Sequence, residues 1–376
     1  MPLTTVEISK KAILCNFRQF KKIVPLGTEV MPVIKSNAYG HGMGEVAKIL
    51  KDHTRYFVVV SIEEALMLRA RGIKNAILVL GNYDGSDKRA FCEAVSKNIE
   101  LAVYSAEVLK HITAATQKAA KQALVHIKID TGMSRFGVPL KEAIKFIYYA
   151  AKLKEIQIRG IYSHFAASDE NEEFTRIQAD RFGKNLAALR KKNISIPHQH
   201  IRNTAGSFLE DIPGNAARVG IGLYGLYPSL WSKQAIQKRN STFFLQPALS
   251  WKTKIIQIKE VEKGTGVSYG CTYTVKEDSR LALVPVGYWD GYDRGLSNRG
   301  VVLVCGKRVP VVGRVCMNQT IVDVSNIPRA YVGQEVVLLG KSGRETITAD
   351  DIAKLLGTIN YEVVTRINPL IPRKVV

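Results

Sequence analysis

A lysine, a tyrosine and a group of glycines stand close together in the segment MPVIKSNAYGHG, residues 31–42. Lys35 ends an apolar, strand-like run, Tyr39 follows four residues later, and Gly40 and Gly42 flank a histidine. A lysine amine at such a place can form a Schiff base with a carbonyl, including the aldehyde of a bound cofactor. The same pattern also suits a strand end that meets solvent and turns at the glycines. The rest of the chain has to decide between the two.

Strand-like runs alternate with mostly helical segments through the first 225 residues. The eight runs cover residues 30–36, 56–61, 76–81, 101–105, 123–130, 158–165, 198–204 and 217–225. Amphipathic helices are expected between them, for example at residues 44–53, 61–72, 141–154 and 171–192, whereas the last crossover is short. Eight parallel strands with helical crossovers are the number that closes an α/β barrel of the TIM type, (β/α)8.

The predicted barrel makes a test possible, because functional groups in such barrels lie at the C-terminal ends of the strands. The residues at those ends are mostly polar or charged: Lys35, Lys128, Asp130, His164, Asn203, Thr204, Arg218 and Gly220. They offer an amine nucleophile, an imidazole base, a guanidinium and donors suited to a phosphate. Strand ends chosen at random would be mostly neutral turn residues, so we predict that Lys35 belongs to a functional site. This fold often binds a phosphate after its last strands, where Asn203, Thr204 and the backbone of residues 220–221 would donate to it.

The pattern changes after about residue 235. Strand-like runs follow at residues 249–261, 280–290, 301–324 and 335–340, and the one short helix expected lies at 348–357. We therefore predict a barrel domain over residues 1–235 and a mostly β domain over 236–376. The boundary is expected in the polar stretch 232–242, and the first few residues of the chain could pair with the β domain.

Composition restricts the class of protein. The chain has 376 residues, of which 46% are hydrophobic, and 54 basic residues against 33 acidic ones give a net charge of +21. The basic residues are spread along the chain without a nucleic-acid-binding motif, so no nucleic-acid partner is expected. No apolar run reaches about 18 residues and the N-terminus lacks a signal-peptide profile, so no membrane association is expected. The five cysteines are scattered without a CxxC pair, which favours free thiols in the cytoplasm and no metal site.

A series of segments resembles the signature blocks of bacterial alanine racemase. In chain order they are VIKSNAYGHG, HIKIDTGMSRFG, GIYSHFA, RVGIGLYGLYPS, GVSYGCTYT, VPVGYWDGY, GRVCMNQTIVDV and INYEVVTRI. The resemblance extends from near residue 7 to the end of the chain. It implies a pyridoxal-phosphate-dependent isomerase (EC 5.1.1.1) that interconverts L- and D-alanine and supplies D-alanine for peptidoglycan. It also implies a barrel followed by a β domain, and a head-to-tail homodimer with shared active sites.

The resemblance assigns the catalytic roles. Lys35 would bind pyridoxal phosphate covalently and act as one base, and Tyr269 would be the opposite base, reaching into the site of the other subunit. The cofactor would also contact a set of residues from both domains: Tyr39, His164, Asn203, Thr204, Arg218, Gly220, Ile221 and Tyr361. Within this set, His164 would lie beside the cofactor ring and Arg218 would meet its nitrogen.

The resemblance also implies substrate contacts. Arg135 and the Met317 amide would hold the carboxylate of alanine, and Lys128 matches a lysine that is often carbamylated in this family to orient Arg135. The entryway would be lined by three further residues: Tyr288, Arg314 and Asp169. Asn318 stands where many relatives carry aspartate, which removes one negative charge near the substrate.

Physical chemistry gives these roles a reason. Racemisation removes a proton from one face of a planar carbanion and returns it on the other, so it benefits from a base on each face. Lysine and tyrosine have similar unperturbed pKa values, near 10.4 and 10, which suits a reaction with an equilibrium constant near one. An arginine at the ring nitrogen gives up its proton with difficulty. The ring is then a weaker electron sink, which restrains transamination and decarboxylation.

Several alternatives stay open at the level of sequence. Tyr361 and Tyr288 could be ordinary half-buried aromatics, His164 could be a core histidine, and Lys128 could pair with Asp130. His198 and His200 are interpreted as structural. A racemase of the same fold with broader substrates (serine, lysine or arginine) would reuse nearly every motif, although the bulk of Tyr361 favours a methyl side chain. A non-catalytic pyridoxal-phosphate carrier built on a lone barrel would lack the β domain, and a nucleic-acid-binding protein would gather its basic residues on one face.

Overall fold

The computed structural model describes residues 2–81 and 83–376, and the chain divides into two compact units. The barrel unit contains residues 11–38 and 46–247. The β unit combines the segment up to Lys10 with residues 39–45 and 248–376. The polar stretch 232–242, where the sequence places the domain boundary, is largely helix α9 (Leu230–Arg239), which begins with a capping box at Ser229.

Eight parallel strands form the sheet of the barrel unit, as predicted. In chain order they are β2 (Glu29–Pro32), β3 (Tyr56–Val59), β4 (Ala76–Val79), β5 (Glu100–Val103), β6 (Ala123–Asp130), β8 (Ile156–Tyr162), β9 (His198–Arg202) and β10 (Ala216–Val219). Their spatial order is β2-β10-β9-β8-β6-β5-β4-β3, with the short β7 (Val138–Pro139) added to β6. A parallel bridge between Val33 and Val58 joins the two ends of this order, so the sheet closes on itself.

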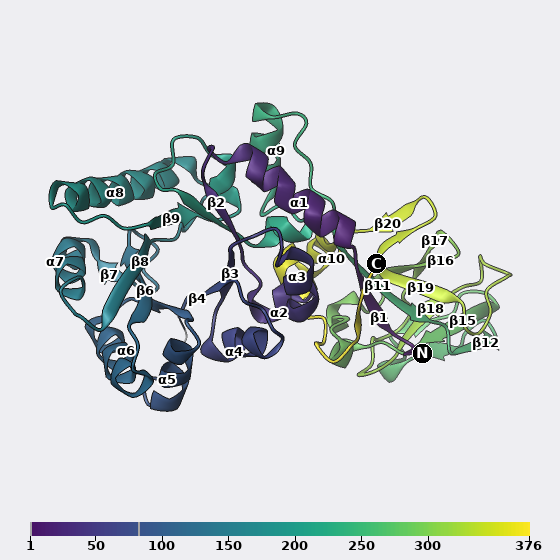
Figure 1. Ribbon diagram of the computed structural model, residues 1–376. Coiled ribbons are helices and arrows are strands. Elements are labelled where there is room, and N and C mark those ends of the chain that lie inside the picture. Colours follow the sequence, from purple (N-terminus) through teal and green to yellow (C-terminus); the bar gives the residue numbers. More distant parts are fainter. Residues whose placement is uncertain (1, 82) are drawn as a thin grey trace. The chain divides into compact units, whose positions relative to one another are not determined.

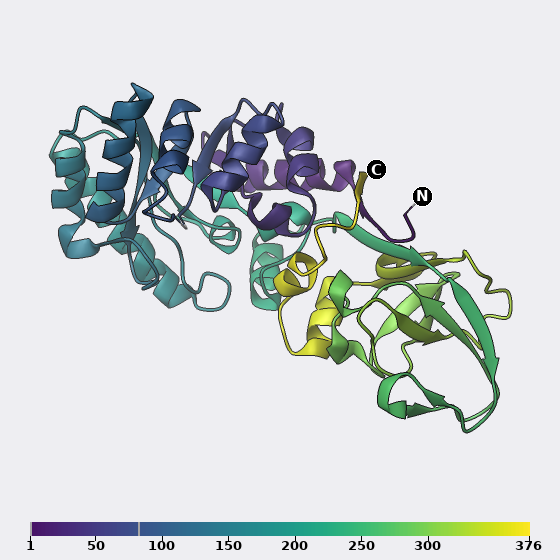
Figure 2. The ribbon, with the colours of Figure 1, turned by 90° about the horizontal axis from the view of Figure 1, so that it is seen from below.

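Helices connect the strands and lie around them (Figures 1 and 2). They are α1 (Lys10–Ile23), α3 (Met43–Leu50), α4 (Ile62–Ala70), α5 (Lys88–Ser96), α6 (Ala106–Ala119), α7 (Leu140–Ala150) and α8 (Glu172–Lys191). The helices predicted at 61–72 and 171–192 begin after the N-caps Ser61 and Asn171, whose side chains accept backbone amides of the first turn. These local signals explain why the two helices start where they do.

The strands end earlier than predicted. β8 ends at Tyr162, β9 at Arg202 and β10 at Val219, so the polar residues of the rim lie just beyond the strands. Two short 3-10 turns occupy the space after β9 and β10: η1 (Ala205–Phe208) and η2 (Ile221–Tyr224). The rim is therefore built from turns, whose backbone amides are not used up by the sheet.

The β unit contains one large sheet and two small ones. The large sheet has the order β17-β16-β19-β11-β1-β21, with β20 paired to β19. Its strands are β1 (Thr5–Ile8), β11 (Leu249–Lys254), β16 (Val301–Val304), β17 (Lys307–Pro310), β19 (Glu335–Ser342), β20 (Glu345–Ile347) and β21 (Arg373–Val375). The small sheets contain β12 (Gln257–Val261), β15 (Ser279–Val284) and β18 (Thr320–Asp323), and β13 (Gly266–Val267) with β14 (Tyr273–Thr274).

Strand β1 joins the start of the chain to its end. It pairs antiparallel with β11 and parallel with β21, so that Val6 lies opposite both Trp251 and Arg373. The unit also carries two helices, α10 (Ala349–Leu356) and α11 (Asn360–Thr365), where the sequence predicted one. Across the described residues, none of the helices combines the length and apolar character that crossing a membrane would require.

Candidate active site

Lys35 stands at the start of a left-handed turn. The residues 36–39 all have φ of 53 or 54°, although none is glycine. Each such residue costs roughly 1–2 kcal/mol, so the turn needs anchors. The carboxylate of Glu64 supplies one, because it accepts the amide of Ser36 at 2.6 Å and the amide of Val60 at 2.9 Å. The backbone that carries the Lys35 amine is therefore fixed in an unusual conformation.

The electrostatic surroundings of Lys35 favour its neutral form. Burial and the positive charge of Arg135 lower the pKa of Lys35, while the carboxylate of Glu64 opposes them. A neutral amine is the nucleophilic form of lysine. The turn thus presents a lysine that is easier to activate than one on an open surface.

Lys128, at the C-terminal end of β6, has a still less basic amine. Its Nζ lies 4.1 Å from the centroid of the Phe136 ring. Burial, together with the charges of Arg135 and Arg218, lowers the pKa of Lys128 to about 7. Asp130 does not act as its close partner, because that carboxylate accepts the backbone amides of residues 132–134 at 2.9 to 3.2 Å. Lys128 is therefore largely neutral slightly above neutral pH.

Arg218 is held inside the barrel by backbone carbonyls and by a histidine. Its guanidinium donates to the Ser163 carbonyl at 2.6 Å and to the His200 carbonyl at 2.9 Å, and it lies 3.2 Å from Nδ1 of His164. Burial lowers the pKa of Arg218 to about 10, which leaves it protonated at pH 7. Burial and the surrounding cations, first Arg218, lower the pKa of His164 well below its usual range. A neutral imidazole therefore stands beside a charged guanidinium.

The turns after β9 and β10 form a small polar cradle. Oγ1 of Thr204 accepts the amides of Gly220 at 3.1 Å and Gly222 at 3.5 Å, which ties η2 to the end of β9. Oδ1 of Asn203 accepts the amide of Gly206 at 2.8 Å, which starts η1. A Cβ on Gly222 would lie 2.7 Å from the methyl group of Thr204, so this close approach depends on glycine. The cradle offers hydroxyl and backbone groups of the kind that bind phosphate.

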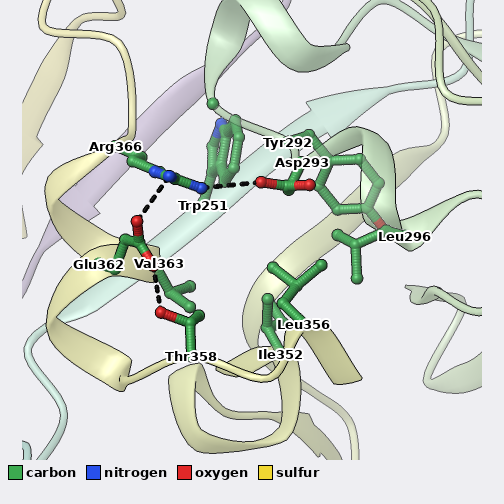
Figure 3. Close-up of a pocket in the computed structure, with 11 residues that line it drawn as sticks. Trp251, Tyr292, Asp293, Leu296, Ile352, Leu356, Thr358, Glu362, Val363 and Arg366 are labelled. Atoms are coloured by element: carbon green, nitrogen blue, oxygen red, sulfur yellow. Dashed lines mark hydrogen bonds and ion pairs between the residues drawn. The ribbon is translucent and has the colours of Figure 1, made fainter. Parts of the chain in front are cut away.

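In the β unit, helix α11 presents Tyr361 toward Tyr39. The centroids of the two rings are 6.2 Å apart at an angle of 49°, and burial raises the pKa of Tyr39 to about 12. Arg366, which caps the helix, forms ion pairs with Asp293 at 2.9 Å and with Glu362 at 2.5 Å (Figure 3). These contacts fix the helix that carries Tyr361.

A cavity lies under the same helix and is lined by Trp251, Tyr292, Leu296 and Val363, among others (Figure 3). Its volume of about 20 Å³ holds little more than one water molecule. The cavity is therefore excluded as a site for an amino-acid substrate.

Tyr269 sits on a second strained turn, η3 (Tyr269–Cys271). Ser268 has a φ of 64° and Cys271 one of 44°, and the Ser268 hydroxyl donates to the carbonyl of Arg314 at 2.7 Å. A Cβ on Gly270 would lie 3.2 Å from Nη1 of Arg314. The Tyr269 side chain is 73% exposed. The segment around Arg314 therefore holds the turn while the phenol remains accessible.

The segment that follows Arg314 is joined to the turn of Tyr288. The amide of Tyr288 donates to the Cys316 carbonyl at 3.0 Å, and the amide of Trp289 donates to the Met317 carbonyl at 2.9 Å. Met317 is 55% exposed. The structure therefore gathers the predicted Tyr269, Tyr288, Arg314 and Met317 in one part of the β unit. Asp169 belongs to the barrel unit, where burial raises its pKa.

Comparisons with known proteins address both units. The alanine racemase N-terminal domain model matches residues 8–228, and the C-terminal domain model matches residues 248–375. Alanine racemase 2 of Caldanaerobacter subterraneus is 42% identical over 98% of this chain and 94% of its own length. The alanine racemase of Methanococcus maripaludis is 41% identical over 98% and 97%. The chain belongs to the alanine racemase family.

Solved structures of the family agree over the full length. The alanine racemase of Clostridium difficile superposes with a TM-score of 0.92 at 36% identity, and it covers 100% of this chain and 96% of its own. The Bacillus anthracis enzyme, solved with bound L-Ala-P, gives 0.90 at 35% identity, covering 100% and 95%. The predicted family, the barrel with its β-rich second part, and the activity of a pyridoxal-phosphate-dependent isomerase (EC 5.1.1.1) are confirmed.

The residues of the barrel unit fit the cofactor of this family. Lys35 supplies an amine with a lowered pKa for the aldehyde, and the turns that Thr204 ties together supply hydroxyl and amide groups for the phosphate. The glycine at position 222 lets η2 pack directly against the side chains of Phe20 and Thr204, where a Cβ would clash. Arg218 supplies a fixed cation beside the neutral His164.

Three further residues contribute to this site, and the sequence predicted a functional role for none of them. Glu64 was not considered, although an acidic residue in the first turn of a helix after a strand is a recognisable signal. His126 precedes Lys128 by two residues and therefore points to the same face of β6. His200 was interpreted as structural, and it contacts the guanidinium of Arg218 in the interior of the barrel.

Proposed function

We propose that this alanine racemase uses Lys35 and Tyr269 as its two bases, and that Tyr269 acts in the site of a second copy of the chain. The reaction is the interconversion of L- and D-alanine, and the D-alanine serves peptidoglycan synthesis. When bound, pyridoxal phosphate withdraws electrons from the α-carbon of alanine and so makes its hydrogen acidic. The remaining chemistry is the movement of one proton on each face of that carbon.

Lys35 is proposed as the base for D-alanine. Its Nζ would take the α-proton on one face and return it there in the reverse direction. The lowered pKa of Lys35, caused by burial and Arg135, supports this role because a base must be neutral to accept a proton. The anchored left-handed turn holds the lysine backbone rigid, which favours a fixed direction of approach.

Tyr269 is proposed as the base for L-alanine. Its Oη would exchange the proton on the opposite face. Tyr269 and Met317, at 73% and 55%, and Trp289 at 60% are large apolar side chains of the β unit that are mostly exposed. Such exposure is typical of a protein interface. This supports a homodimer in which each β unit completes the site of the other subunit.

The substrate carboxylate is assigned to Arg135 and the Met317 amide. We propose that Lys128 becomes carbamylated, and that the carbamate orients Arg135. A pKa of about 7 supports this, since only a neutral amine reacts with carbon dioxide. We propose that the cofactor is held by a set of side chains and backbone amides: the side chains of Tyr39, Tyr361, His164, Arg218, Asn203 and Thr204, and the amides of Gly220 and Ile221. Tyr288, Arg314 and Asp169 are proposed to line the entryway.

The observation that carries the two-base proposal is the contrast between a half-buried lysine with a lowered pKa and an exposed tyrosine on a strained turn. Replacement Tyr269→Phe tests it by exchange of the α-hydrogen with deuterium in heavy water. The variant should lose racemisation in both directions, should still exchange D-alanine and should exchange L-alanine far more slowly. Tyr331→Phe, which changes another exposed tyrosine of the β unit, should behave as wild type. Equal exchange of both enantiomers in Tyr269→Phe would show that one base serves both faces.

A further inference from the structure

A chain of hydrogen bonds crosses the interior of the barrel from Arg218 to Glu100. Nη1 of Arg218 contacts Nδ1 of His200, Nε2 of His200 lies 2.8 Å from Nδ1 of His126, and Nε2 of His126 lies 2.6 Å from Oε2 of Glu100. The four residues are at most 2% exposed. They come from β10, β9, β6 and β5, and Glu100 is the first residue of its strand. The chain therefore leads from the rim, where ligands bind, toward the opposite end of the barrel.

The arginine determines the direction of every bond in this chain. A guanidinium has donors only, so Nδ1 of His200 must be the acceptor. Burial and the charge of Arg218 lower the pKa of His200 well below its usual range, so the imidazole is neutral and carries its proton on Nε2. That proton is donated to Nδ1 of His126, whose own proton then lies on Nε2 and is donated to Glu100. Both tautomers are fixed, and all three donors point toward the carboxylate.

Glu100 ends the chain as an ionised group. Burial opposes its ionisation, but the hydrogen bond from His126 and the charge of Arg159, 3.8 Å from Oε1, lower the pKa of Glu100. The hydroxyl of Tyr56 also donates to Oε1 at 3.2 Å. On the other side of Tyr56, its oxygen lies 2.9 Å from Nε2 of His198. His198 thus lies next to this series of hydrogen bonds but is not part of the connection from Arg218 to Glu100.

Stability alone gives no reason for a carboxylate, two imidazoles and a guanidinium in a barrel core. Buried charges lose their hydration, and apolar side chains of similar volume often serve stability as well or better. A network with all of its members bonded does, however, fix one arrangement of its groups. The group placed at the rim by this arrangement is the guanidinium of Arg218. The orientation of that guanidinium is therefore the property that the network controls.

We propose that Glu100 is a positioning residue which, through His126 and His200, fixes the orientation and charge of Arg218 toward the cofactor ring nitrogen and thereby restricts the enzyme to racemisation. The inference rests on the proposed role of Arg218. The reaction that it suppresses is transamination, in which the proton taken from the α-carbon is delivered to the aldehyde carbon of the cofactor. In this reaction, alanine and pyridoxal phosphate give pyruvate and pyridoxamine phosphate. The α-carbon of alanine is oxidised, the aldehyde carbon of the cofactor is reduced and receives the amino group, and the water lost on condensation is regained on hydrolysis, so no other oxidant is needed.

Three variants distinguish the effect of the Glu100 charge from the effect of the hydrogen-bond connection and from a general disturbance of the barrel core. Glu100→Gln keeps an oxygen for His126 but removes the charge, and His126→Leu interrupts the chain. His198→Gln disturbs the neighbouring polar group and is the matched control. Two measurements apply to each: nitrogen-15 NMR of the histidine rings in the cofactor-free protein, and the ratio of pyruvate formed to alanine racemised in the loaded enzyme.

The ring signals of His200 should change in both His126→Leu and Glu100→Gln, because His200 links Glu100 to Arg218, and should stay near wild type in His198→Gln. The pyruvate ratio should rise roughly tenfold in both Glu100→Gln and His126→Leu, since a charged hydrogen bond is lost from the chain, and should stay unchanged in His198→Gln. An unchanged ratio in Glu100→Gln would remove Glu100 from this role, whatever His126→Leu does. If Glu100→Gln fails to fold, Glu100→Asp replaces it, because aspartate shortens the side chain but keeps the charge. The pyruvate ratio should then rise less in Glu100→Asp than in His126→Leu. An equal rise in the two variants would overturn the proposal. A wild type without bound cofactor or racemisation would contradict the proposed function instead.

Discussion

Gly40 and Val364 approach so closely that a Cβ on Gly40 would lie 2.0 Å from the Val364 carbonyl oxygen. Gly40 directly follows the left-handed turn of residues 36–39, and Val364 belongs to helix α11, which carries Tyr361. The glycine therefore seats the end of the turn against the helix, with Tyr39 and Tyr361 beside the contact. The spacing of the two tyrosines depends on this absence of a side chain.

Replacement Gly40→Ala should lower the thermal unfolding midpoint strongly and weaken cofactor retention. Gly27→Ala is the matched control, because Gly27 has nearly the same φ (82° against 85°) but nothing within 4 Å of its Cβ position. Gly27→Ala should lower the free energy of unfolding by only about 1 kcal/mol through backbone strain. Gly40→Ala should lower it by at least about 2 kcal/mol more, because its Cβ also clashes with the Val364 carbonyl. Calorimetry of the two variants would measure the difference, and equal midpoints would show that the contact is easily relieved.

Replacement Lys35→Ala should give a colourless protein without racemase activity. The wild type should be yellow, since the aldehyde of pyridoxal phosphate bound to a lysine absorbs visible light. Lys51→Ala, which removes an exposed lysine of the barrel unit, should keep both colour and activity. Absorbance spectra and an alanine assay decide the matter. A colourless, cofactor-free wild type that racemises alanine at full rate would exclude Lys35 as the attachment site.

Mixed dimers should recover activity from two inactive variants. If Tyr269 acts in the neighbouring site, a dimer of Lys35→Ala with Tyr269→Phe contains one site with both defects and one with neither. The mixture should then reach about a quarter of wild-type activity at equal amounts with free exchange, because half of the dimers are mixed and each has one intact site. Mass spectrometry would confirm the exchange. Confirmed exchange without recovery would place Tyr269 in the site of its own chain.

Replacement Tyr361→Asn should raise the relative activity on serine. The ring of Tyr361 lies 6.2 Å from that of Tyr39, and we expect it to fill the space beyond a methyl side chain. Discrimination by packing supplies about 1–3 kcal/mol, so the serine-to-alanine ratio of kcat/KM should rise by one or two orders of magnitude at most. Tyr331→Asn should leave this ratio unchanged. An unaltered ratio in Tyr361→Asn would remove this residue from the substrate pocket and reopen the broader-substrate alternative.

Carbamylation of Lys128 should depend on pH. With a pKa of about 7, its amine is mostly neutral at pH 8 and mostly charged at pH 5.5, whereas an ordinary lysine stays charged at both values. Carbon-13 NMR in labelled bicarbonate should show a carbamate signal at pH 8 that disappears on acidification. Lys128→Met should lack the signal and should show a higher KM for alanine. A signal of equal size in this variant would assign the carbamate to another lysine.

The sequence allowed the barrel and most of its rim to be predicted. Periodic apolar runs identify strands and helices, and the rule that functional groups follow the strands predicts that Lys35, Lys128, His164 and Arg218 lie at one rim. The structure places these four close enough for their charges to influence one another. The local sequence pattern and the rule for the fold were together sufficient to predict this part of the site.

Other features depend on contacts that no local pattern reveals. The left-handed turn after Lys35 contains no glycine, and Asn37 is its only residue of a type that favours a positive φ. Its anchor, Glu64, is 28 residues away from Ser36. The bond between His126 and Glu100 joins neighbouring strands whose register fixes the contact, and register is set by the whole sheet.

The pairing of β1 with both β11 and β21 has a consequence for synthesis on the ribosome. Strand β1 is made before the barrel, yet both of its partners follow the barrel sequence, and Val6 pairs with residues as late as Arg373. At about 5–20 residues per second, β21 is made roughly 6 to 25 seconds after the barrel sequence is finished. During that time the edge of β1 that pairs with β21 has no partner, although the barrel sequence is already complete. The large sheet of the β unit is therefore complete only after β21 has been made.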